Sequence, residues 1–150
     1  MDMTFKLADV ADINLLLEFM REFYELDHLA LDEQAVRPAL QQILRNEAFG
    51  KVWLIQADGN PIGYIVLTLG FSLEFHGRDA FIDEIYIRAQ HRGRGIGRRA
   101  IEFVEGACLS LGVRALHLEV ERENTNAQGM YRKVGFEVQD SYLMTKYVAS

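Results

Sequence analysis

Hydrophobic residues recur at helical spacing in three parts of the chain. In the first part, Ile13, Leu16, Leu17, Met20 and Tyr24 predict a helix that Asp9 or Asp12 would cap. A second helix is predicted from Asp32 to Asn46, with Val36, Leu40, Ile43 and Leu44 facing inward. A third is predicted from Ile96 to Leu111, ended by Gly112.

The segments around these helices have the pattern of strands. The runs "KVWLIQA" and "IGYIVLTLGF" flank the turn signal Asp58-Gly59 and predict a hairpin. Further strands are predicted at "FKL", "DAFIDEIYI" and "VRALHLEV", a short helix at "NTNAQGMYRKV", and a closing antiparallel pair at "FEVQD" and "SYLMTKYV". This order indicates an α/β protein with a mixed sheet.

Length and composition limit the class of protein. A chain of 150 residues predicts a single domain over residues 1–150. Cys108 is the only cysteine and the four histidines lack metal spacing, so we expect no disulfide within the chain and no metal. With neither a signal-peptide pattern nor an apolar run of about 20 residues, we expect a cytoplasmic protein without a membrane partner.

Positive charge and glycine are concentrated in one stretch of an acidic chain. The net charge is -6, yet the segment from Arg88 to Arg99 contains five arginines and no acid. It also contains Gly93, Gly95 and Gly97, immediately before and within the start of the third predicted helix. One basic patch on an acidic protein favours a small anionic ligand over nucleic acid.

The glycine stretch matches neither of two common phosphate-binding motifs. The Rossmann pattern would need glycine where Arg98 stands, and the Walker A pattern would need Gly-Lys followed by Ser or Thr. The physics of those motifs still applies, because glycines let backbone N–H groups approach an anion at a helix start. Arg98 and Arg99 oppose the helix dipole by ~0.3–1 kcal/mol each, and a bound anion would reverse that sign. The alternatives are a turn with solvated arginines and an RNA-binding segment.

Two motifs together carry a resemblance to a known family. Arg92-Gly93-Arg94-Gly95-Ile96-Gly97 fits the pattern Arg/Gln-x-x-Gly-x-Gly/Ala, and it follows a predicted strand and opens a predicted helix. A second motif follows one helix and one strand later, with Asn124, Ala127, Tyr131, Gly135 and Phe136. In this order the motifs resemble those of the GNAT superfamily of acetyl-CoA-dependent N-acetyltransferases.

The resemblance implies a fold and a co-substrate. The fold is a mostly antiparallel central sheet with helices on both faces and a splayed pair of parallel central strands. Acetyl-CoA would place its pyrophosphate on the turn and its pantetheine along the strand of Ile85 and Ile87, with Asn124 beside it. The turn residues so implied are Arg92, Gly93, Arg94, Gly95, Ile96, Gly97 and Arg98. A homodimer is also implied.

The resemblance also implies catalytic roles. Tyr131 matches the position of the general acid, and Glu84, Glu119 and Asp83 are candidates for the general base, with Glu84 and Glu119 level and Asp83 behind. Strand alternation sends Asp83 and Glu84 to opposite faces unless the strand is bulged. The alternative for each acid is a structural salt bridge.

The predicted function is direct transfer of an acetyl group to a primary amine, either a small cationic amine, a lysine side chain or a peptide N-terminus. Acids on and between the first two helices favour a cationic acceptor, although they are also compatible with a solvated helix face: Glu22, Glu25, Asp27, Asp32 and Glu33. The rival functions are a non-catalytic acetyl-CoA-binding module and an RNA-binding protein. Tyr131 and the strand acids argue against the first.

Overall fold

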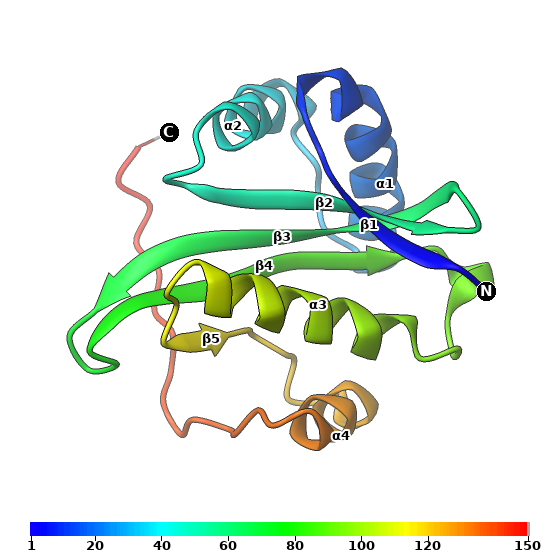
Figure 1. Ribbon diagram of the computed structural model, residues 1–150. Helices are drawn as coiled ribbons and strands as arrows, with labels where there is room; N and C mark the ends of the chain where they lie inside the picture. The colour runs from blue at the N-terminus through cyan, green and yellow to red at the C-terminus, as the bar shows by residue number, and fades with distance from the viewer. Residues whose placement is uncertain (150) are drawn as a thin grey trace. The chain divides into compact units, whose positions relative to one another are not determined.

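The computed structural model describes residues 1–149 and divides into two compact units, the first from Met1 to Glu119 and the second starting at Val120. The first unit contains β1 (Met3–Leu7), α1 (Ile13–Leu26), α2 (Glu33–Arg45), β2 (Gly50–Ala57), β3 (Asn60–Ser72), β4 (Gly77–Ile87), α3 (Ile96–Ser110) and β5 (Ala115–His117). Short 3-10 turns precede α1 and follow β4, at Val10–Asp12 and Ala89–His91. The second unit contains α4 (Thr125–Lys133) (Figure 1). One domain over residues 1–150 stays a prediction.

The strands of the first unit form one mixed sheet in the order β1-β2-β3-β4-β5. Each neighbouring pair is antiparallel except β4 and β5, which are parallel. The parallel pairing joins only Asp79, Ala80 and Phe81 to β5, so within residues 1–149 no strand pairs with this side of β4 beyond Phe81. The parallel pairing is thus limited to three residues, in keeping with the splayed pair that the resemblance implied.

Helices cover both faces of this sheet (Figure 1). On one face, α1 and α2 pack over Val52, Tyr64 and Tyr86 in a shared apolar core. Because side chains alternate along a strand, Trp53 points to the other face, where its ring meets Phe103 of α3 edge-on. The predicted layers are confirmed.

Aspartates cap the short turn before α1 and the start of α2, and for the first of these Asp9 and Asp12 were the predicted candidates. Asp9 and Asp12 form a capping box around the short turn that leads into α1. Asp32 accepts a hydrogen bond from the N–H of Ala35 at the start of α2. These caps lie a few residues from the groups they satisfy, and so local sequence is enough to predict them.

The closing pair of strands predicted at 136–140 and 141–148 was wrong, because the structure has no strand there. Apart from the half-buried Phe136, the large apolar side chains of this segment are 65–91% exposed, as at Val138 and Val148. An isolated two-stranded hairpin is marginal in water, and the junction at Asp140-Ser141 lacks a strong turn signal. The strand predicted over "VRALHLEV" is likewise limited to the three residues of β5.

Candidate active site

A β-bulge in β4 decides where its two acids point. Along the β3–β4 pairing, Val66 lies opposite Glu84 and Leu67 lies opposite Ile82. Asp83 is therefore an extra residue without its own partner in β3. Such a bulge interrupts the alternation of faces, which is the condition under which Asp83 and Glu84 can face the same space.

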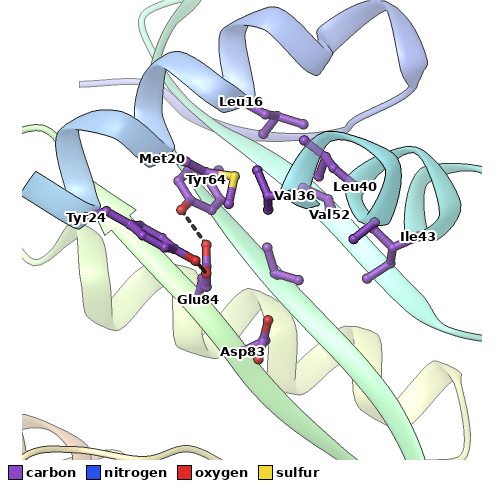
Figure 2. Close-up of a pocket in the computed structure, with 12 residues that line it drawn as sticks. Leu16, Met20, Tyr24, Val36, Leu40, Ile43, Val52, Tyr64, Asp83 and Glu84 are labelled. Carbon is purple, nitrogen blue, oxygen red and sulfur yellow. Dashed lines mark hydrogen bonds between the residues drawn. The ribbon is translucent and has the colours of Figure 1, made fainter. Parts of the chain in front are cut away.

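Both acids line one pocket between α1, α2 and the sheet, with a volume of about 260 Å³. Most of the lining is aliphatic: Leu16, Met20, Val36, Ala39, Leu40, Ile43, Val52 and Val66. The remaining four residues are polar: Tyr24, Tyr64, Asp83 and Glu84. Figure 2 shows the tyrosines converging on Glu84, while Val36, Leu40 and Ile43 gather on the α2 side.

Two tyrosine hydroxyls hold the Glu84 carboxylate. Tyr64 of β3 donates to Oε1 at 2.7 Å, and Tyr24 of α1 donates to Oε2. Burial raises the pKa of Glu84 above its usual value, the two phenol hydrogen bonds work in the opposite direction, and the charge of Asp83 raises it again. Burial and the neighbouring Glu84 also raise the pKa of both phenols, which stay protonated donors at neutral pH.

Asp83 has a freer carboxylate than Glu84. Within residues 1–149 its side chain makes no hydrogen bond or ion pair; the residue is exposed, yet loss of water around its carboxyl at the pocket raises its pKa. Glu119, the third acid candidate, is exposed, follows the end of β5 and is not a lining residue of this pocket. The structure thus brings two of the three acids together, and the role of Glu119 stays a prediction.

The glycine turn leads from the end of β4 into α3, whose start at Ile96 is confirmed. Gly93 and Gly95 have φ of +77° and +75°, and a Cβ at either would meet no atom within 4 Å. Glycine is therefore required there by backbone conformation and not by crowding. The first bond of the helix runs from the N–H of Arg99 to Gly95, so the N–H groups of residues 96–98 have no acceptor within the helix. Such a helix start fits an anionic group.

The arginines of this stretch differ in their contacts. Arg92 donates from Nε to the carbonyl of Ile87 at 2.8 Å, which joins the turn to the end of β4. Arg88 binds Glu22 at 2.9 Å, and Arg98 pairs with Glu102 one helical turn later at 3.0 Å. Only part of the predicted basic patch is therefore free of carboxylate partners.

The open side of β4 runs past the pocket toward the glycine turn. Ile85 and Ile87 lie beyond the last pairing with β5. In an antiparallel pair, part of each strand's backbone N–H and C=O groups points away from the partner strand. These groups of β4 suit an extended ligand that hydrogen-bonds as a strand would, as expected for the pantetheine arm.

In the second unit, α4 carries the residues of the second motif. Asn124 caps the helix by accepting from the N–H of Ala127 at 3.1 Å. Tyr131 lies with its ring edge-on to Phe136, and burial raises the pKa of its phenol. The expected contact of Asn124 with pantetheine and the acid role of Tyr131 stay predictions.

Residues 1–149 contain neither a metal-binding group of side chains nor a membrane-spanning helix. No three His, Cys, Asp or Glu side chains are grouped so that they could hold a metal ion. No helix in that range has the length and apolar character needed to cross a membrane.

Comparison with known proteins agrees with this geometry. Residues 14–136 match the model of the acetyltransferase (GNAT) family. The chain therefore belongs to the GNAT family of acetyltransferases. It is an acyltransferase, and its co-substrate is acetyl-CoA, as the resemblance carried by the two motifs implied.

Individual relatives cover most of the chain. Thialysine N-epsilon-acetyltransferase of Bos taurus is 29% identical over 85% of this chain and 80% of its own length. A putative ribosomal protein bS18-alanine N-acetyltransferase of Bacillus subtilis is 26% identical over 83% of this chain and 78% of its own length. An integron cassette protein from the mobile metagenome of Cole Harbour Salt Marsh is 36% identical, with a TM-score of 0.86 over 97% of this chain and 91% of that protein.

The tyrosines that hold Glu84 were missed by the sequence analysis. Tyr24 and Glu84 are 60 residues apart, and Tyr64 and Glu84 are 20 apart. Tyr24 was predicted to lie on the apolar face of a helix, and no contact with Glu84 was predicted for it. A polar hydroxyl at each of two otherwise inward-facing positions was the one available signal.

Proposed function

We propose that this protein transfers the acetyl group of acetyl-CoA directly to a primary amine that binds in the pocket between α1, α2 and the sheet. The observation that carries the proposal is the bulge at Asp83, which turns two adjacent carboxylates into one apolar pocket beside the unpaired edge of β4. The relatives named above act, by their names, on the side-chain amine of thialysine and on an alanine of a ribosomal protein. Both names are consistent with an amine acceptor here.

The co-substrate would be held by backbone groups. The N–H groups of the turn from Arg92 to Arg98 would bind the pyrophosphate, since those at the start of α3 have no acceptor within the helix. The backbone of Ile85 and Ile87 would bind the pantetheine along the open edge of β4, with Asn124 contributing from α4. This arrangement points the thioester along β4 toward Asp83 and Glu84.

The carboxylates would serve proton transfer. An alkylammonium with a pKa near ~10.4 must lose a proton before its nitrogen can attack a carbonyl carbon. Glu84, with Asp83 beside it, accepts that proton and passes it to water. The C–N bond forms, the C–S bond breaks, and the nitrogen gives its second proton to Glu84, which is ionised again after passing the first proton to water. Tyr131 is the proposed donor of a proton or hydrogen bond to the departing sulfur.

The base assignment is tested with Glu84→Gln, which keeps the shape of the side chain but removes its charge. We expect kcat to fall by roughly 10²–10⁴-fold, the usual range for loss of a general base, with little change in the affinity for acetyl-CoA. Release of free thiol in the presence of an amine mixture measures turnover. Glu105→Gln, an exposed position on α3, is the matched control. A Glu84→Gln enzyme with unchanged kcat would remove Glu84 from the mechanism.

The acid assignment is tested with Tyr131→Phe. Loss of the hydroxyl is expected to lower kcat by about 10²-fold while the affinity for acetyl-CoA stays the same. Tyr147→Phe makes the same change at a side chain that is 90% exposed. If both variants turn over at the parental rate, Tyr131 only packs against its neighbours.

The homodimer and the cytoplasmic location stay predictions.

A further inference from the structure

We propose that the preferred acceptor is a primary amine on a compact, uncharged, apolar body, such as an alkylamine or arylalkylamine, and not a polyamine or another amine with a second charge. The inference rests on the proposed function and deepens it, because it names the chemistry of the acceptor. It follows from the distribution of charge within the pocket.

Charged side chains line the pocket at one place only. Asp83 and Glu84 are adjacent on β4, and among residues 1–149 they are the only charged residues that line it. Opposite them, α1, α2 and β2 contribute aliphatic side chains such as Leu16, Leu40 and Val52 (Figure 2). An ammonium group therefore has a partner at one end of the pocket, and a second charge on the same molecule would lie against aliphatic carbon.

The size of the pocket favours a small body. The pocket volume of about 260 Å³ is small for a ligand site. Sites for drug-sized ligands start at about 300 Å³. An amine with a chain of about six carbons, or with one aromatic ring, matches this volume.

Two of the acids on and between the first two helices form ion pairs within the protein. Glu22 accepts from Tyr86 at 2.9 Å and binds Arg88. Glu33 forms an ion pair with Arg21 at 2.6 Å. The acidic surface that the sequence suggested for a cationic acceptor is thus partly neutralised, and none of its acids lines the pocket.

These contacts set the expected order of acceptors. Each methylene buried against the aliphatic wall improves kcat/KM by roughly fourfold. A second ammonium or a carboxylate at the far end of the chain must lose its water without gaining a partner, which is costly. A matched series of six-carbon amines therefore distinguishes a pocket for an uncharged acceptor body from a pocket for an acceptor with a second charge.

The experiment compares hexylamine, 1,6-diaminohexane and 6-aminohexanoate at saturating acetyl-CoA, with propylamine and butylamine to measure the effect of chain length. We expect kcat/KM for hexylamine to exceed that of either doubly functional amine by at least tenfold, and to rise by roughly fourfold per methylene from propylamine. Equal or better turnover of 1,6-diaminohexane or 6-aminohexanoate, or a flat length series, would overturn the inference and leave the proposed function standing. No turnover of any of the five amines would overturn the inference, and the proposed function would fall with it if the amine mixture also released no free thiol.

A variant with a charged residue in the pocket wall gives an independent measurement of acceptor specificity. Val36→Asp places a carboxylate in the aliphatic wall on α2 and should raise the ratio of 1,6-diaminohexane to hexylamine turnover by at least tenfold. Val10→Asp, at an exposed position that does not line the pocket, should leave the ratio unchanged. A folded Val36→Asp enzyme with the parental ratio would contradict the proposed position of the apolar body. If this variant does not fold, the amine series alone decides.

Discussion

Glu84 is a carboxylate whose two oxygens are each held by a tyrosine from a different element. Tyr24 approaches from α1 and Tyr64 from β3, so the carboxylate is fixed at the end of the pocket. A carboxylate has about four acceptor positions, so two remain for an ammonium group. The same hydrogen bonds stabilise the charged form against the effect of burial.

Removing one tyrosine hydroxyl should change the pH dependence of the reaction. The hydrogen bond from Tyr64 lowers the pKa of Glu84, so Tyr64→Phe should raise that pKa further above its usual value. Because the base must be ionised to accept a proton, the acidic limb of the kcat/KM profile should move to higher pH. Rates measured from pH 5 to 9 in Tyr64→Phe, with the exposed Tyr142→Phe as control, test this shift.

The pH dependence of kcat/KM in Glu84→Gln is the second measurement of this kind. Without an ionisable group at this position, the acidic limb caused by Glu84 should disappear. A limb that stays in place in both Tyr64→Phe and Glu84→Gln would assign it to another group.

At the scale of elements, the start of α3 depends on two glycines for its backbone conformation. Gly95 precedes the helix with φ of +75°, whereas Gly106 lies within the helix, is exposed and has open space around it. Replacement by alanine should therefore have opposite effects on the free energy of unfolding at Gly95 and at Gly106.

Urea unfolding without co-substrate measures this difference. Gly95→Ala should lower the free energy of unfolding by about 1–2 kcal/mol, because a Cβ is disfavoured in the left-handed region. Gly106→Ala should raise it by about 0.5–1 kcal/mol, because alanine loses less entropy in a helix. Equal stabilisation by both changes would show that the turn does not require positive φ at residue 95.

Local signals explain which elements could be predicted from the sequence. Asp9, Asp32 and the glycine before Ile96 satisfy or shape groups within a few residues, and the helices they begin were predicted to within a residue or two. The strands near the C-terminus were not predicted correctly, because a strand depends on a partner that its own sequence does not supply.

The site was predictable to a similar extent. The acids of β4 were evident as charges in an apolar run, and the bulge was foreseen only as the condition for their acting together. The identity of the extra residue, Asp83, depends on register against Val66 and Leu67 in β3, which no local pattern specifies. The pairing of Glu84 with two distant tyrosines was invisible for the same reason.

At the scale of the whole molecule, an acidic chain has to bind an anionic co-substrate. The net charge of -6 opposes this, and the arginine-containing turn before α3 provides the local exception. Binding to the folded state alone raises stability by mass action, by about 2.7 kcal/mol when the ligand is at 100 times its Kd.

Thermal unfolding should therefore report co-substrate binding directly. For a chain of this length, 2.7 kcal/mol corresponds to a rise in Tm of roughly 5–10 °C. Gly95→Asp should abolish the rise, because it places a carboxylate where the phosphates are expected, while the variant still unfolds cooperatively. A full rise in Tm for folded Gly95→Asp would refute the phosphate site.

The bulge at Asp83 also has a consequence for how this site could have evolved. Deleting one residue from a regular strand reverses the face of every residue that follows. Asp83, however, is the unpaired extra residue, and removing it would leave Ile82 and Glu84 opposite Leu67 and Val66 as they are now. A single in-frame codon deletion should thus yield a folded enzyme with one pocket carboxylate. Conversely, one inserted codon suffices to add a second acid to such a strand without repacking the core.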